Sequence, residues 1–499
     1  MSETQPSAAG LATHRDKSDV GYRKGLKSRH MRMIALGGAI GSGLFFGASG
    51  RISEGGPSVA IVYAICGAVA YMMLRALAEL SLYRPSSGGF ISHAREFMGE
   101  RGAYFTGWFA FITYSSALMA DITAIANYMH YWEIFRVIPQ WGWAFIALAL
   151  MVIVNLASVK FFGEFEFWFA MIKVAAIVVF MILAIIVLIL GINLTVGGQV
   201  YHPGVGAITN HGGLFPKGAF TMVTMSLGVL FAYGGTEYLG AAAGEAEDPQ
   251  KEMPKAVNSM MWRILLFYVG CIVLFTLLLP HNVYDKNESP FVTFFTAIGI
   301  PAAGTIMNIV VMLAAASAIN AELYTCGRGL RSLAVSGSAP RFLAGMNRNA
   351  VPYAAIVAAG TVGLVGVIIN MIHPSEAFDV IAYMAGIGIC SMWGSVMISN
   401  ILFVRHCRRT GLERPKFHVP WAPYTNYVVL AVFASMIVLM WFEGGLGPAA
   451  IIAFASVTVV LALAWPGWWC ATTLTMTCLH LRQFPKQSQK PKLLITSSI

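Results

Sequence analysis

A series of apolar runs, each long enough to cross the hydrocarbon core of a membrane, constrains the fold of this chain most strongly. An α-helix needs about 20 apolar residues to span that layer. Twelve runs meet this length, at 31–51, 57–82, 103–130, 141–159, 166–190, 219–242, 261–280, 291–322, 352–372, 376–404, 422–442 and 446–466. Only 11% of the 499 residues are charged, whereas soluble domains carry about 25%. We therefore expect an all-α integral membrane protein with twelve transmembrane helices.

The positions of lysine and arginine predict the orientation of the chain. Cytoplasmic segments of membrane proteins carry an excess of both residues. With the N-terminus inside, twenty-seven of the 33 basic residues fall in cytoplasmic segments or at the cytoplasmic ends of the runs, and Arg51, Arg136, Lys217 and Lys286 are external. We therefore expect residues 1–30 to form a cytoplasmic arm and residues 467–499 a cytoplasmic tail. The same bias explains the net charge of +10, so no nucleic-acid partner is predicted.

The first apolar run contains an unusual concentration of glycine. In Leu36–Gly47, LGGAIGSGLFFG, five of twelve residues are Gly, and each Gly is about 1 kcal/mol less favourable than Ala in a helix. A break at Gly41-Ser42-Gly43 would free backbone groups, which is tolerable only beside protein or a hydrated cavity. The alternative is close helix packing, which small residues also permit.

The sixth run repeats this anomaly, with Gly234-Gly235 near its middle. Glycine-interrupted segments at corresponding positions of two halves indicate a transporter site. Residues 31–190 and 219–404 would then form two inverted repeats of five helices, and 422–466 two additional helices. The N-terminal end of a half-helix suits a carboxylate and a C-terminal end suits an ammonium group. A zwitterionic α-amino acid needs both, with the Ser42 hydroxyl as a further contact and Phe231 and Tyr233 as an aromatic gate.

Charged residues inside apolar runs are costly and commonly functional. Asp121, in the third run, is expected either to face the substrate, where it would accept from a side-chain amide, or to serve helix packing. Glu237 follows the pair Gly234-Gly235 and is expected near the site. Glu79 lies one turn after Arg75, so it takes part either in proton coupling or in an internal ion pair with that arginine.

Lys173 lies well inside the fifth run, between apolar residues. Burial disfavours the ammonium form, so such a lysine is suited to exchange a proton. The alternative is a side chain that reaches the cytoplasmic interface, about 13 Å away along the helix at 1.5 Å per residue. Because the side chain would have to bridge this distance, we favour proton coupling over a position at the interface.

Other classes of site find little support. The seven Cys have no paired spacing, so neither disulfides nor a metal site are predicted. An ion channel needs a continuous polar pore. The polar residues of this chain are instead expected to gather at one site near the middle of the membrane. A membrane enzyme lacks a nucleophile or metal motif. No cofactor is expected, and a proton gradient would drive the protein.

Five segments resemble the amino acid permeases of the amino acid–polyamine–organocation superfamily, in particular their bacterial proton-coupled branch. They are GGAIGSGLFFG (37–47), RPSSGGFISHAREFMG (84–99), EFEFWFAMIKVAAIV (164–178), GEAEDPQKEMPKAVNS (244–259) and INAELYTCGRGLRSLA (319–334). The resemblance implies the leucine-transporter fold with discontinuous helices 1 and 6, and proton symport by alternating access. It also implies a location in the bacterial inner membrane, among lipids, and leaves the oligomeric state open.

Carried over residue by residue, the resemblance places the substrate's carboxylate and amino groups at Ile40, Gly41, Ser42, Gly43, Phe231, Ala232 and Gly234. It places Lys173 at the position that sodium occupies in sodium-coupled relatives. Asn320 matches a common Asn-Ser pair, but Ala321 replaces the Ser and Glu322 replaces a small residue, which weakens the transfer of roles to this helix.

The resemblance also suggests the substrate. Residues 120–132 and 337–354 are most similar to the asparagine permeases, so uptake of a neutral polar amino acid, L-asparagine first, is expected. The segment FFGEFEFWFAMIK, residues 161–173, is close to a motif typical of carriers for D-serine, D-alanine and glycine. That group remains the alternative.

Overall fold

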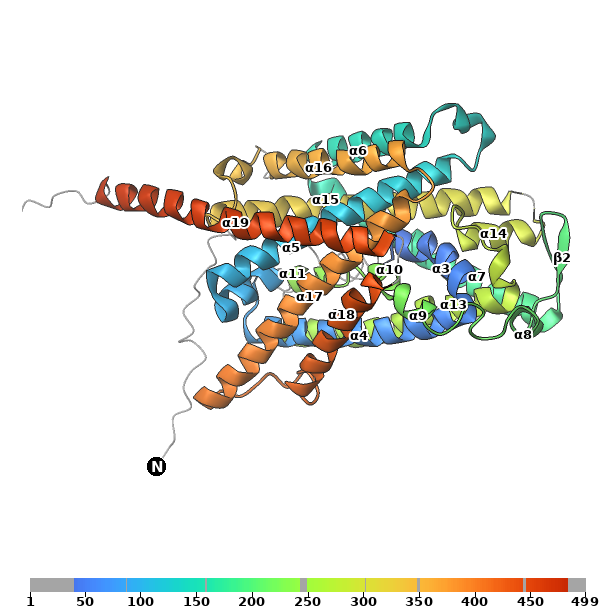
Figure 1. Ribbon diagram of the computed structural model, residues 1–499, viewed down its shortest axis with the longest axis horizontal. Coiled ribbons are helices and arrows are strands. Elements are labelled where there is room, and N and C mark those ends of the chain that lie inside the picture. Colours follow the sequence, from blue (N-terminus) through green and yellow to red (C-terminus); the bar gives the residue numbers. More distant parts are fainter. Residues whose placement is uncertain are drawn as a thin grey trace, which may run out of the picture. The chain divides into compact units, whose positions relative to one another are not determined.

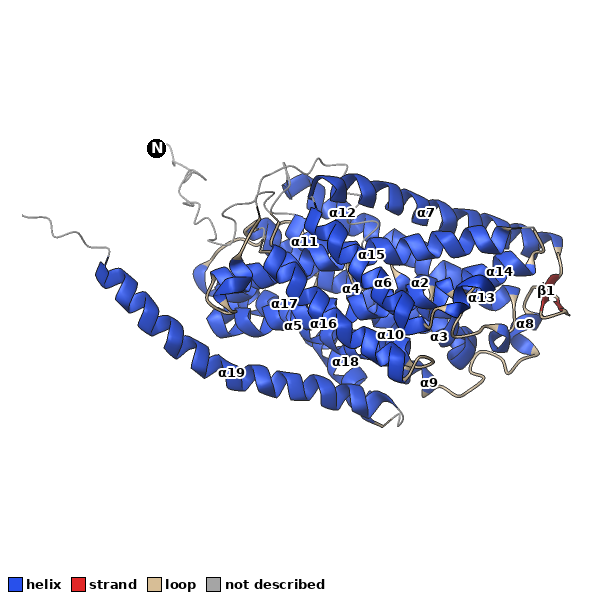
Figure 2. Cartoon of the chain, turned by 90° about the horizontal axis from the view of Figure 1, so that it is seen from above, coloured by secondary structure: helices blue, strands red, loops and turns tan. Residues whose placement is uncertain are grey.

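The computed structural model describes residues 40–86, 88–157, 159–242, 249–300, 302–347, 351–442 and 446–482. The chain divides into two compact units, Met1–Ala455 and Ser456–Ile499. Within the described residues nearly all regular structure is helical, as Figures 1 and 2 show. The exception is a short antiparallel hairpin of β1 (Leu194–Val196) and β2 (Gln199–Tyr201), in which Leu194 pairs with Tyr201.

Ten helices of the described residues are long and apolar enough to cross a membrane. Most are single elements, and two join neighbouring elements. The longer elements are α4 (Val59–Tyr83), α5 (Gly89–Met129), α6 (Gln140–Ala157), α7 (Val159–Leu190), α12 (Pro249–Arg263), α13 (Gly270–Leu278), α15 (Ala303–Val335), α16 (Tyr353–Ile372), α17 (Ala377–Thr410), α18 (Tyr424–Trp441) and α19 (Leu446–Arg482). The shorter elements are α2 (Ser42–Phe45), α3 (Gly47–Gly55), α8 (Gly206–Thr209), α9 (Thr221–Thr224), α10 (Ser226–Phe231), α11 (Tyr238–Ala242) and α14 (Pro290–Ala297).

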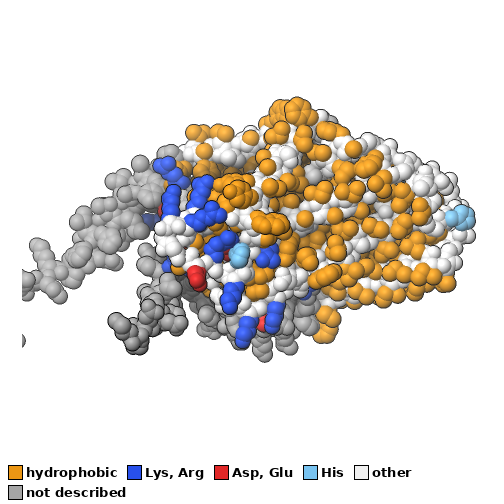
Figure 3. All heavy atoms as spheres, turned by 90° about the horizontal axis from the view of Figure 1, so that it is seen from below, with side chains coloured by type: hydrophobic (Ala, Val, Ile, Leu, Met, Phe, Trp, Pro, Cys, Tyr) orange, Lys and Arg blue, Asp and Glu red, His pale blue; other side chains and the backbone are white. Residues whose placement is uncertain are grey.

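Large apolar side chains cover much of the outer surface of the first unit. Ile153, Ile189 and Ile368 are among the exposed ones. On the face drawn in Figure 3, hydrophobic side chains predominate and lysine and arginine gather toward one end. Exposed apolar surface of this extent marks contact with a membrane or another protein, and the helical lengths favour the membrane.

A central group of helices is built around α5. Helix α5 packs against both α15 and α17, and α16 packs between α6 and α15. Small residues permit these close approaches: a Cβ at Gly388 of α17 would lie 2.4 Å from the Thr113 hydroxyl oxygen of α5. The polar residues of α5 are therefore held against the two helices that face them.

The segment 219–242 is interrupted, as predicted from its glycine pair. Helix α10 ends at Phe231 and α11 begins at Tyr238, with a non-helical turn between them. Gly235 adopts φ +89° in this turn, a left-handed conformation that residues other than Gly rarely adopt. The turn therefore depends on the second glycine of the pair.

The first apolar run contains a helix start at the predicted glycines. Gly41 is extended, with φ −118° and ψ −160°, and α2 begins at Ser42. Residues 31–39 lie outside the described part of the chain. Gly43 passes so close to the turn after α10 that a Cβ there would lie 2.5 Å from the Cα of Ala232. The two irregular segments are thus in direct contact.

Several predicted boundaries were wrong. The long helix of the run 291–322 was expected to begin near Phe291 or Ile300, and only the later start fits. Gly299 (φ +76°) and Ala302 (φ +63°) adopt left-handed conformations that end α14 before α15 begins at Ala303. Residues 249–259, which lie between the predicted runs 219–242 and 261–280, are helical in α12. The predicted span 446–466, by contrast, agrees with the membrane-spanning part of α19, Gly447–Trp465, and the helix continues beyond it to Arg482.

Candidate functional site

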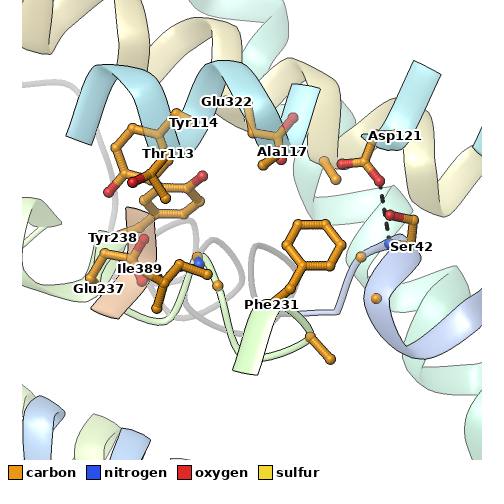
Figure 4. A pocket seen from close by; sticks show the side chains of 16 residues that line it. Ser42, Thr113, Tyr114, Ala117, Asp121, Phe231, Glu237, Tyr238, Glu322 and Ile389 are labelled. Carbon is orange, nitrogen blue, oxygen red and sulfur yellow. Dashed lines mark hydrogen bonds between the residues drawn. The ribbon is translucent and has the colours of Figure 1, made fainter. Parts of the chain in front are cut away.

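A cavity opens where the two irregular segments meet α5, α15 and α17 (Figure 4). The free space inside it is about 30 Å³, so its walls lie close together. Its lining comes from five parts of the chain. These residues are Gly41, Ser42, Gly43, Thr113, Tyr114, Ala117, Asp121, Phe231, Ala232, Gly234, Gly235, Glu237, Tyr238, Ala318, Glu322 and Ile389.

Asp121 lies at one end of this cavity, beside the start of α2. Its Oδ1 accepts a hydrogen bond of 3.3 Å from the backbone N–H of Ser42 (Figure 4). An N–H at the start of a helix has no intrahelical acceptor, so the carboxylate satisfies one of these groups. The Ser42 hydroxyl is buried and makes no hydrogen bond with the described residues. This end of the cavity therefore combines backbone donors with a free hydroxyl.

Glu237 lies at the opposite end of the cavity, in the turn after α10. Its Oε2 accepts hydrogen bonds from the backbone N–H of Gly235 at 3.1 Å and from Nε1 of Trp393 at 3.2 Å. Tyr114 from α5 is close enough to interact with this carboxyl group electrostatically. Glu237 thus fixes the turn against α17 and α5 and gives this end of the cavity an acidic character.

Glu322 projects from α15 between these two ends, as Figure 4 shows. Its side chain is only 6% exposed, and Oε2 accepts no hydrogen bond of ordinary geometry from the described residues. The Asp121 and Glu237 carboxyl groups are near enough to interact with it electrostatically. Three carboxyl groups therefore surround one small space, an arrangement that attracts cations and hydrogen-bond donors.

Several residues predicted for this site lie outside its lining. Ile40 and Tyr233 line a second, smaller cavity instead. The Tyr233 hydroxyl donates to the carbonyl of Tyr63 at 2.7 Å, and its ring stacks on Tyr268. Asn320 faces away from the site, where its Oδ1 accepts a hydrogen bond from Nδ2 of Asn155. Neither Tyr233 nor Asn320 reaches the cavity directly.

Lys173 also lies outside the lining, although it is buried with only 1% of its side chain exposed. Its Nζ donates a hydrogen bond of 2.9 Å to the hydroxyl of Ser317 on α15. The side chain therefore ends inside the bundle and does not extend to the interface. Ser317 directly precedes Ala318, a cavity residue, so α15 connects the lysine to the site.

Glu79 belongs to a separate polar cluster. Its side chain is fully buried, and Oε1 accepts from Nε of Arg414 at 2.7 Å. Oε2 accepts from Asn400 Nδ2 and from the N–H of Val419. The predicted internal pair with Arg75 was wrong, because that arginine donates to a backbone carbonyl instead. A coupling role for Glu79 stays a prediction.

We expect Glu79→Ala to lower the free energy of unfolding by about 3 kcal/mol, the lower end for removing one partner of a buried ion pair. The substitution strands the Arg414 guanidinium and removes acceptors from two further groups. The loss would be measured by unfolding in detergent. Glu100→Ala, which breaks the more exposed pair with Arg95, should change stability by less than about 1 kcal/mol. Equal effects of the two substitutions would contradict the prediction.

Residues of α5, α15 and α17 were missing from the predicted site. Thr113, Tyr114 and Ala117 lie one or two helical turns before Asp121, so spacing along one helix face could have found them. Glu322 is an acidic residue within an apolar run, the same signal that identified Asp121. Of the remaining unpredicted lining residues, Gly235 belongs to the glycine pair that predicted the break, and the other three carry no such sequence signal. They are Tyr238, Ala318 and Ile389.

Comparison with known proteins agrees with this geometry. The family model described as amino acid permease matches residues 30–480. The L-asparagine permease of Streptomyces coelicolor is 48% identical over 462 residues, which are 93% of this chain and 94% of the relative. The L-asparagine permease of Escherichia coli is 45% identical over 447 residues, 90% of this chain and 89% of the relative.

The chain therefore belongs to the amino acid permease family. With ten helices able to span a membrane in the described part of the chain, it is a multi-pass membrane protein, and its relatives are named permeases, which are transporters. Its substrate is accordingly a small molecule of the amino acid type.

Proposed function

We propose that this protein imports L-asparagine together with protons across the bacterial inner membrane by alternating access. The observation that carries the proposal is the cavity between two irregular backbone segments, with free backbone groups and carboxyl groups on its walls. The similarity to L-asparagine permeases of several bacteria supports the choice of substrate. No metal or cofactor is part of this proposal.

The cavity has suitable groups for both charges of an α-amino acid. At the start of α2, the N–H groups of the first turn and the Ser42 hydroxyl would receive the substrate carboxylate. Across the cavity, the carbonyl oxygens of Ala232 and Gly234 accept no backbone hydrogen bond from the described residues. These oxygens, with the Glu237 carboxylate nearby, suit an ammonium group. Phe231 would cover the bound molecule.

Binding of the substrate carboxylate would compete with Asp121 for the Ser42 N–H. Both groups are carboxylates, and the amide has one hydrogen to donate. We propose that Asp121 holds the start of α2 in place when the site is empty and withdraws as the substrate enters. Substrate binding would then be coupled to the position of α2.

We propose that Lys173 carries the coupling proton. Its hydrogen bond to Ser317 gives the ammonium group a partner on α15, and loss of the proton would remove that donated bond. Protonation would therefore favour one arrangement of α7 against α15, the helix that also carries Glu322. This coupling is of the kind that links an ion to substrate affinity.

The proposed architecture has twelve spans in two inverted repeats of five plus two additional helices, as in the leucine-transporter fold. Interrupted segments at the start of each repeat, with α5 and α15 at corresponding places, support it. The gathering of lysine and arginine toward one end of the face in Figure 3 supports cytoplasmic termini.

An ion pair across the bundle supports the alternating movement. Nη1 of Arg51 on α3 donates to Oδ1 of Asp379 at the start of α17, at 2.7 Å. The guanidinium also lies against Gly228 of α10, where a Cβ would collide with it. Both halves of the site are thus tied together on the predicted external side, and opening would require this pair to separate.

The proposal is tested by uptake of radiolabelled L-asparagine into liposomes that contain the purified protein. When the solution outside the liposomes is one pH unit more acidic than the inside, the internal concentration of substrate should rise about tenfold. One pH unit is worth about 1.4 kcal/mol per proton. A sodium gradient alone should have no effect. Stronger inhibition by unlabelled D-serine than by unlabelled asparagine would overturn the proposed substrate, and uptake driven only by sodium would overturn the proposed coupling.

A further inference from the structure

We propose that Glu322 selects the substrate by accepting a hydrogen bond from its side-chain carboxamide. This inference rests on the proposed function and assigns the part of the site that contacts the side chain. Glu322 is placed at the cavity by α15, which runs without interruption from Ala303 to Val335. Ala318, one turn earlier, lines the same cavity, so this face of the helix looks into the site.

Two of the three carboxyl groups have an unused acceptor oxygen, Oε2 of Glu322 and Oε1 of Glu237. Oε2 of Glu322 is buried and accepts no hydrogen bond of ordinary geometry from the described residues. A buried polar atom without a partner costs about 1–3 kcal/mol. A substrate that donates a hydrogen bond to this oxygen would recover that free energy, whereas an aliphatic side chain would not.

The other two carboxyl groups each accept hydrogen bonds at the two ends of the cavity. Asp121 accepts from the N–H of Ser42, at the end of the cavity suited to the substrate carboxylate. Glu237 accepts from Gly235 and from Trp393, beside the carbonyl groups suited to the ammonium. Glu322 lies between these ends (Figure 4), where the side chain of an amino acid held at both ends would project. Its position and its free oxygen favour it over Asp121 as the amide acceptor.

The chemistry of the group also explains discrimination against acidic substrates. A carboxamide offers two N–H donors, and a carboxyl oxygen of Glu322 accepts a hydrogen bond in either protonation state. The side chain of aspartate has the same shape but offers only acceptors and a negative charge when ionised. Asp121, Glu237 and Glu322 would together repel that charge. Lys173, bound to Ser317, lies outside the lining.

Two substitutions separate these effects, with uptake of L-alanine as the internal reference because alanine has the same backbone groups and no side-chain amide. Glu322→Ala should reduce the preference for asparagine over alanine at least tenfold while alanine uptake persists. Glu322→Gln keeps an acceptor and adds a donor, so it should keep asparagine uptake and make aspartate at least tenfold more inhibitory. Glu133→Gln, on the 3₁₀ turn of residues 133–137, is the control and should change neither ratio.

The outcomes are distinguishable. If both Glu322 variants keep the wild-type preference for asparagine over alanine and the wild-type inhibition by aspartate, the role of Glu322 is overturned and the proposed function stands. Loss of alanine uptake together with asparagine uptake in both folded variants would also overturn it, because a residue that reads the side chain does not act on the shared backbone groups. Failure of the wild-type protein to take up either amino acid would overturn the proposed function and this inference with it.

Discussion

Replacing Lys173 with alanine is expected to abolish accumulation of substrate driven by a pH gradient, while exchange of internal for external substrate continues. The wild-type protein should reach about tenfold accumulation with one pH unit at one proton per substrate, and the variant about onefold. The reason is that Lys173, bonded to Ser317 on α15, is near enough to interact electrostatically with the carboxyl groups of Asp121 and Glu322. Without it, movement of the substrate no longer requires movement of a proton.

The measurement is uptake into liposomes, made once with an imposed pH gradient and once as counterflow at equal pH. Lys286→Ala removes a lysine from an exposed position and should behave as the wild type in both assays. Lys173→Arg should also lose the response to pH, since a guanidinium keeps its proton at all relevant pH values. Accumulation by Lys173→Ala under the pH gradient would remove this lysine from the coupling mechanism.

The irregular backbone of the site could be predicted because the conformational effect of glycine is local in the sequence. The pair Gly234-Gly235 indicated a break, and a turn with Gly235 in a left-handed conformation follows α10. For Gly41-Ser42-Gly43, which indicated either a break or close packing, the described residues show an extended Gly41 and the start of α2 at Ser42. Apolar length alone predicted most long helices, but it could not show that Gly299 and Ala302 separate α14 from α15.

The partners of the charged residues could not be predicted, because they are far apart in the sequence. Helix spacing indicated Arg75 as one possible partner of Glu79, yet its partner Arg414 lies 335 positions away. Likewise, nothing local indicates that Tyr233 turns to Tyr63 while Phe231 faces the cavity. The direction of a side chain in an irregular turn is set by tertiary contacts on each side of the turn. These contacts leave no periodic pattern in the sequence.

Gly43→Ala is expected to reduce transport at least tenfold, because it forces apart the two irregular segments that form the site. A Cβ at Gly43 would lie 2.5 Å from the Cα and 3.0 Å from the N of Ala232. Backbone atoms cannot rotate away as a side-chain end can, so α2 or the turn after α10 must move. Overpacking of this kind commonly costs about 1–3 kcal/mol, and here the displaced groups are those proposed to hold the substrate carboxylate and ammonium.

Gly329→Ala is the matched control, since it adds the same methyl group within α15 where no atom outside the local backbone lies within 4 Å. It should keep wild-type transport and gain slightly in stability, because Ala is the better helix former by about 1 kcal/mol. Uptake by both variants would be compared after unfolding measurements confirm that each is folded. If Gly43→Ala is folded and transports as the wild type does, direct contact of the two segments is not required, and the substrate must be held by side chains rather than by paired backbone ends.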